Sequence, residues 1–138
     1  MAADGMITLR SKHGPQETMA RLEAEVEAKG MTVFARVDHA AGAAAVGLAL
    51  RPTDLLIFGA AKGATPLMQS IQTIGIDLPL KALVMDDSGT TWLSYNDPDW
   101  LAKPHGLGAE AGAPLKAMGA AVSVIAAASV IAAAATAR

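Results

Sequence analysis

The residues best suited to chemistry lie in one segment, Phe58–Thr65, which follows an apolar run and precedes a helical pattern. Gly59 and Gly63 let the backbone approach a ligand closely, and Lys62 supplies a positive charge. The amides from Gly63 to Thr65, at the start of the expected helix, would favour an anion. The residue order is not that of a phosphate-binding P-loop, because Lys62 precedes its glycine. The segment therefore predicts either an anion-binding turn or a plain strand-to-helix turn.

A second candidate is His39, which follows Asp38 at the junction of an expected strand and a short helix, of which Asp38 is the expected N-cap. Histidine can act as a general acid or base near neutral pH, and the alternative is a histidine bonded only to nearby backbone. Asp86 and Asp87 resemble a catalytic carboxylate pair. Adjacent residues of a strand point to opposite faces, however, so we expect these two to be solvated residues of a β-hairpin that turns at Asp86–Gly89.

Metal and thiol chemistry have little support in the sequence. The chain has no cysteine, which excludes disulfides, thiolate catalysis and cysteine-ligated zinc. His13 and His105 lie in loops that contain glycine and proline, where we expect exposed side chains. No spacing places two ligands on one helix face, so we expect no metal site and no cofactor.

The composition fits one globular domain outside the nucleic-acid-binding classes. The chain has 138 residues, of which 52% are apolar and 17% charged, and its net charge is −2. No cluster of lysine or arginine supplies the basic face that nucleic acid requires. The first residues lack the features of a signal peptide. We therefore expect a cytoplasmic protein.

The C-terminal region, Ala117–Ala137, is uncharged and long enough to span a bilayer. Most of it is alanine, which contributes little to membrane insertion. Met118, Val122 and Ile125 recur at helical spacing on one face. These features favour a helix that packs on protein over one that spans a membrane. We expect an α+β domain over residues 1–108 and a helix within 109–138 that packs on that domain or on a dimer partner.

The periodicity predicts alternating strands and helices. Strands are expected at Met6–Arg10, Met31–Val37, Leu55–Phe58, Leu80–Met85 and Thr91–Tyr95. Helices are expected after Gly14-Pro15, at His39–Val46, at about Ala64–Ile74 and at Asp99–Lys103, with the last one after a linker at Ala109–Pro114. Val33, Ala35 and Val37 would share one face, and Leu55–Phe58 would be buried on both faces. The order β-α-β-(α)-β-α-β-β-α predicts an α+β fold, with a mixed or antiparallel sheet and helices packed on one face.

Several motifs carry a family resemblance: Ser11-Lys12, Glu17–Met19, Lys29–Phe34, Asp38-His39, Leu50–Thr53, Phe58-Gly59, Lys62-Gly63, Thr65–Met68, Asp77–Lys81 and Tyr95–Pro98. Together they resemble the bacterial family called domain of unknown function 302, over about Met6 to Leu107. The resemblance implies a fold similar to the TATA-box-binding-protein-like class, without its DNA role. It also implies a homodimer and no established activity. The family carries Asn-Pro after Phe-Gly, whereas this chain has Ala60-Ala61, which removes a turn-forming side chain and one ligand contact.

The sequence thus predicts a small homodimeric protein that binds a small anionic ligand where the Phe58–Thr65 turn approaches His39 and Tyr95. The expected contacts are His39, Phe58, Gly59, Lys62, Gly63, Thr65 and Tyr95. Two alternatives stay open: a structural or interaction module, and an enzyme whose acid or base is His39. Catalysis is the less favoured of these functions.

Overall fold

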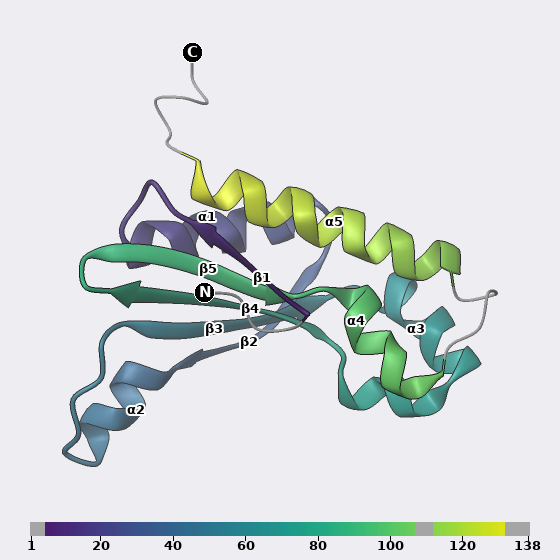
Figure 1. Cartoon of the computed structure of the whole chain (residues 1–138), viewed down its shortest axis with the longest axis horizontal. Coiled ribbons are helices and arrows are strands. Elements are labelled where there is room, and N and C mark those ends of the chain that lie inside the picture. The colour runs from purple at the N-terminus through teal and green to yellow at the C-terminus, as the bar shows by residue number, and fades with distance from the viewer. Residues whose placement is uncertain (1–4, 107–111, 132–138) are drawn as a thin grey trace.

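The chain forms one antiparallel sheet with helices on one face (Figure 1). The computed structural model describes residues 5–106 and 112–131. The strands are β1 (Met6–Arg10), β2 (Thr32–Asp38), β3 (Thr53–Gly59), β4 (Leu80–Asp87) and β5 (Thr90–Asn96), in the order β1-β5-β4-β3-β2. The helices are α1 (Pro15–Ala28), α2 (His39–Ala45), α3 (Ala61–Ser70), α4 (Pro98–Ala102) and α5 (Gly112–Val130), with short 3-10 helices η1 (Gln72–Ile76) and η2 (Lys103–His105). The predicted α+β fold is confirmed.

Local sequence signals account for two of these elements. Helix α1 begins with Pro15 in its first turn and ends before Gly30, whose φ is +76°. Strands β4 and β5 form a hairpin closed by Ser88 and Gly89, both with positive φ. This is the turn that suits the twist of a two-residue hairpin loop.

The core lies between the sheet and the layer of helices α1 and α5, which run side by side over one face in Figure 1. Leu56, Phe58, Val84 and Leu93 point into it from the strands, and each is fully buried. Leu55–Phe58 was expected to be buried on both faces, and that prediction is wrong. Leu55 and Ile57 stay partly exposed, because they point to the face that no helix covers.

Strand β2 contains a β-bulge at Phe34. Val33 pairs with Phe58 and Ala35 pairs with Ile57, so Phe34 is the additional residue. The bulge reverses the side-chain alternation along β2. Val33 therefore packs on the core, whereas Ala35 pairs on the uncovered face, contrary to the expectation that these two residues share one face.

Helix α3 begins earlier than predicted. It starts at Ala61 rather than Ala64, so Pro66 lies inside the helix instead of at its first turn. The helix ends at Ser70, and η1 replaces the predicted last turn. Its N-cap, Ala60, has no side-chain oxygen to mark the boundary.

Helix α5 packs on α1, α3, α4 and β1. Met118, Val122 and Ile125 are buried, as their spacing predicts. The helix begins at Gly112, within the predicted linker, and residues 132–137 of the predicted helix lie outside the described part of the chain. With a mean hydropathy of 1.6, Gly112–Val130 is long and apolar enough to cross a membrane, and 33% of its apolar window is buried in the domain. A core helix meets the same criteria.

The segment between β2 and β3 projects from the domain at the lower left of Figure 1. The Asp38 side chain caps α2 by accepting a 2.9 Å hydrogen bond from the Ala41 amide, as predicted. None of the residues of α2 is buried. Val46 is 73% exposed and Leu48 66% exposed. We call residues 39–50 the α2 arm.

Candidate functional site

An apolar pocket of about 230 Å³ lies at the β3–α3 junction, in the segment that the sequence singled out. Its walls come from the start of β2, the β3–α3 turn, the entry to β4, and α5. The lining residues are Met31, Phe34, Gly59, Ala60, Ala61, Gly63, Ala64, Thr65, Met68, Leu78, Pro79, Leu80 and Met118.

Gly59 and the β2 bulge shape the floor of this pocket. Gly59 is the last residue of β3 and pairs with Thr32. A Cβ atom at Gly59 would lie 3.5 Å from Pro79 Cβ and 3.7 Å from Phe34 Cε2. The bulge places Phe34 beside Gly59, and the absence of a side chain at Gly59 leaves the space between Phe34 and Pro79 open.

The lining of the pocket is almost wholly apolar. Thr65 carries the only polar side chain among the lining residues, and none of them is ionisable. Met31, Met68 and Met118 are flexible thioethers, which adapt their shape to irregular apolar partners. The pocket can therefore bury an apolar group, and a charged group would lose hydration there without a partner.

The helix-end amides predicted to hold an anion are used within α3. The Gly63 and Ala64 amides both donate to the Ala60 carbonyl, each at 3.0 Å. This follows from the early start of the helix at Ala61. The predicted amide site at Gly63–Thr65 is therefore wrong in its geometry, although Gly63 and Thr65 both line the pocket.

Lys62 lies at the edge of the pocket rather than in its wall. Its neighbours Ala61 and Gly63 are lining residues, whereas the Lys62 side chain is exposed. Among the described residues it makes no ion pair. Lys62 can thus meet the charged end of a ligand whose apolar part occupies the pocket.

His39 does not approach this pocket. It follows Asp38, which pairs with Asp54, whereas Gly59 pairs with Thr32 at the other end of the same two strands. Six residues of strand separate the two ends, which is about 20 Å. His39 is exposed, and its ring makes no hydrogen bond within the described residues. The predicted convergence of His39 with the turn is therefore wrong.

Phe58 and Tyr95 belong to the core. Phe58 is fully buried, and Tyr95 is 5% exposed on the helix-covered face of β5. Neither lines the pocket. Phe58 instead fixes the end of β3 from which the pocket turn departs.

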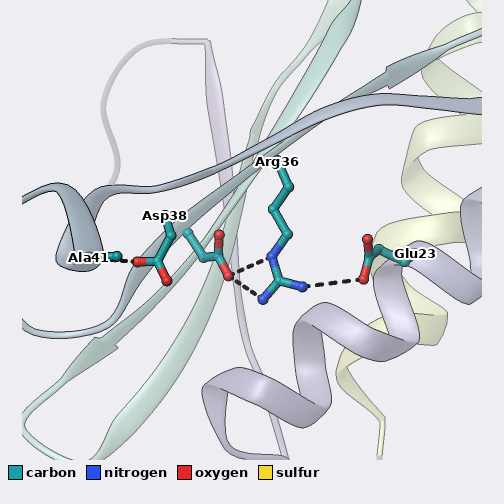
Figure 2. Close-up of polar contacts among 5 residues, drawn as sticks. Glu23, Arg36, Asp38 and Ala41 are labelled. Carbon is teal, nitrogen blue, oxygen red and sulfur yellow. Dashed lines mark hydrogen bonds and ion pairs between the residues drawn. The ribbon is translucent and has the colours of Figure 1, made fainter.

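At the opposite end of β2, a polar cluster joins three elements (Figure 2). The Arg36 Nε donates to Asp54 Oδ2 at 2.9 Å, and its Nη1 lies 3.4 Å from Glu23 Oε1 on α1. The hydrogen bond to Asp54 raises the pKa of Arg36 above its ordinary value. This cluster ties β2 and β3 to α1 where the helix layer ends.

His105 is the residue that the sequence misjudged most. It was expected to be exposed, but its side chain is 9% exposed and its Nε2 lies 2.6 Å from Asp77 Oδ2. The pair joins η2 to the residue that directly follows η1. The 28 residues between Asp77 and His105 leave no local signal of this pair.

The fold and the pocket define a small α+β protein with an apolar pocket at the β3–α3 junction. The sequence pattern described as "Domain of unknown function DUF302" matches residues 7–125, and the chain belongs to this family. The match extends into α5, beyond the region over which the motifs alone suggested it. A solved structure, "Crystal structure of uncharacterized conserved protein DUF302 from Bacillus stearothermophilus", has the same fold, with a TM-score of 0.83 and 21% identity. The similarity covers 91% of this chain and 98% of that one.

Curated relatives carry a different name. "Fluoride-specific ion channel FluC 1" of Brucella suis biovar 1 (strain 1330) is 50% identical over 115 residues, which is 83% of this chain and 45% of the relative. "Fluoride-specific ion channel FluC 2" of Brucella melitensis biotype 1 (strain ATCC 23456 / CCUG 17765 / NCTC 10094 / 16M) is also 50% identical, over 43% of its length. This chain therefore spans less than half of the length of these relatives.

Proposed function

We propose that this chain is a cytoplasmic binding protein for a small amphiphilic anion, with the apolar part of the ligand in the β3–α3 pocket. The observation that carries the proposal is the pocket itself, which forms at the glycine-containing turn and is lined almost wholly by apolar side chains. Lys62, exposed at its edge, would meet the negative end of the ligand. The ligand that we propose is still a small anion, as the sequence predicts. The apolar part of this ligand, however, is the main determinant of its affinity.

The size of the pocket limits the ligand. An engineered apolar cavity of about 150 Å³ in another protein holds one benzene molecule. A pocket of about 230 Å³ therefore suits a monocyclic aromatic or a medium-length acyl chain. Octanoate and 1-octanol are a matched pair of probes, since they share the chain and differ in charge.

Titration calorimetry with both probes tests the proposal. We expect both probes to bind wild type, Ala64→Leu to abolish binding by filling the pocket, and Lys62→Ala to weaken octanoate about 3- to 10-fold while leaving octanol unchanged. Ala44→Leu on the α2 arm is the matched control for the first substitution, and Lys12→Ala for the second. Absence of binding to wild type, or equal binding by Ala64→Leu and Ala44→Leu, would sink the proposal.

A second candidate function is self-association, and we infer that the α2 arm forms part of a homodimer interface. The arm is uncharged from Ala40 to Leu50, and it exposes Val46, Leu48 and Leu50 to solvent. The uncovered sheet face beside it is also partly apolar: Leu50, Met85 and Trp92 line a shallow groove there. A second copy supplies both an arm and a groove, so one two-fold interface would cover both.

Sedimentation velocity on charged variants tests this inference. Leu48→Asp should convert a dimer to a monomer, because it buries a charge at the interface. Ile76→Asp is the matched control, since Ile76 is 82% exposed on η1, outside the arm. A monomeric wild type, or a dimer that survives Leu48→Asp, would exclude the arm as the interface.

Fluoride conduction is not part of the function that we propose for this chain. The region matched in the Brucella relatives corresponds to an antiparallel sheet with one long apolar helix. We expect the channel activity named for those relatives to reside in the remaining half or more of their length. Purified chain added to fluoride-loaded liposomes should leave the rate of fluoride efflux at its protein-free value.

A further inference from the structure

Three side chains outside the pocket form a linear hydrogen-bonded cluster. Thr73 Oγ1 lies 2.9 Å from His105 Nδ1, and His105 Nε2 lies 2.6 Å from Asp77 Oδ2. Thr73 lies in η1 and Asp77 directly follows it, and His105 reaches them from η2. A hydroxyl, an imidazole and a carboxylate are thus connected in that order by two hydrogen bonds.

The order of these groups is the order needed to activate a nucleophile. A carboxylate that accepts from one ring nitrogen keeps the proton there and leaves the other nitrogen free to accept a proton. Here Asp77 occupies Nε2, so Nδ1 is the nitrogen available to the Thr73 hydroxyl. A purely structural contact between the two loops would need only one of these two hydrogen bonds. Both ring nitrogens are engaged, and each meets the partner that base catalysis requires.

The solvent exposure of the three side chains also fits a hydroxyl nucleophile, an imidazole base and a carboxylate that positions the base. The His105 side chain is 9% exposed and the Asp77 side chain 36% exposed, so the imidazole is held away from bulk water. Thr73 is exposed, so its hydroxyl can be reached by a substrate. His39 and His13 offer no comparable arrangement: the ring of His39 has no partner among the described residues, and that of His13 contacts the Ile131 backbone carbonyl.

We propose that Thr73 is a nucleophile for acyl transfer from activated carboxylic esters, with His105 as its general base and Asp77 as the residue that positions His105. In the first step Thr73 Oγ1 attacks the ester carbonyl, its proton passes to His105 Nδ1, and the acyl–oxygen bond of the ester breaks. The departing alcohol takes the proton, which leaves an acyl ester on Thr73. Water, deprotonated by the same nitrogen, then releases the carboxylic acid and restores the hydroxyl.

The test uses p-nitrophenyl butyrate and the full chain. Release of p-nitrophenol is followed by absorbance, and the acylated residue is mapped by peptide mass spectrometry after acid quenching. We expect the butyryl group on Thr73, no adduct in Thr73→Val, and restored acylation in Thr73→Ser. His105→Gln should slow acylation at least about 100-fold, the usual scale of general-base catalysis, and Asp77→Asn should slow it by a smaller factor.

Matched controls separate this site from general reactivity. Thr32→Val removes another exposed threonine, and His13→Gln removes another histidine, so both should react like wild type. An adduct on His105 or a lysine, or equal p-nitrophenol release by wild type and Thr73→Val, would overturn the assignment. Mapping the adduct on wild type needs no variant, so the result stands even where a substitution prevents folding.

Discussion

The two ends of the β2–β3 strand pair differ in what covers them. At the Gly59 end, α3, the entry to β4 and Met118 of α5 enclose an apolar pocket. At the Asp38 end the strands extend beyond α1 and carry the α2 arm, in which no helical residue is buried. Both ends are rich in alanine and glycine, so composition does not separate them. The comparison shows that the same residue types form a site or an unpartnered surface, depending on whether a helix layer lies above them.

The largest expected difference concerns the two phenylalanines of the chain, Phe58 and Phe34. Phe58→Ala should lower the free energy of unfolding by about 3–5 kcal/mol, because Phe58 is fully buried and the substitution leaves a cavity. Phe34→Ala should cost less than about 1 kcal/mol, since Phe34 is 54% exposed. Urea unfolding followed by circular dichroism measures both. Similar costs would contradict the assignment of Phe58 to the core and Phe34 to the pocket rim.

The two aspartate caps give the next largest effect. Asp97 caps α4, where Pro98 and Ala102 are buried, and Asp38 caps α2. Asp97→Ala should cost about 1 kcal/mol of global stability. Asp38→Ala should instead promote local opening of the arm and leave global stability nearly unchanged, because α2 buries no residue. Amide hydrogen exchange distinguishes local opening from global destabilisation. In Asp38→Ala, faster exchange confined to residues 39–45 would support the difference between the two caps, and faster exchange throughout the domain would contradict it.

Substitution of Arg36 tests whether the contact with α1 stabilises the β2–β3 pair near the α2 arm. Arg36→Met should cost about 1 kcal/mol, because Arg36 is 42% exposed and its ion pairs are partly screened by solvent. Since the pKa of Arg36 is raised above its ordinary value, its contribution is lost only as the pH rises through that raised pKa. A thermodynamic cycle with Asp54→Asn isolates the pair. A coupling energy of zero would mean that the cluster in Figure 2 does not stabilise the fold.

The smallest effect is expected at the tip of the arm. Val46→Ser should change the free energy of unfolding of the monomer by less than about 0.5 kcal/mol, because Val46 is already 73% exposed. Dilute samples, held below the dissociation constant of any dimer, are needed for this measurement. Concentrated samples should show a loss of stability if the arm is an interface, and an equal result at both concentrations would contradict that role.

Local signals were sufficient for part of this molecule. The Asp38 cap, the Ser88-Gly89 turn and the stripe of α5 depend on neighbouring residues, and each was predicted. The pocket turn was located by its two glycines, of which Gly59 faces the space between Phe34 and Pro79, whereas Gly63 has open space around it. The early start of α3 was missed because Ala60 offers no capping side chain. The Asp77–His105 pair was missed because it depends on tertiary packing between distant loops.

The β2 bulge also means that this strand contributes to both faces of the sheet in turn. The additional residue Phe34 shifts the alternation of side chains along β2 by one position. Val33, before the bulge, therefore contributes to the core, and Val37, after it, contributes to the uncovered face. Deleting Phe34 would leave both flanking pairings intact, because Val33 and Ala35 already face the consecutive residues Phe58 and Ile57. The deletion would instead remove one wall of the pocket, where Phe34 lies beside Gly59. Homologous chains in which β2 is one residue shorter at this point should therefore keep the sheet and lose this side of the pocket.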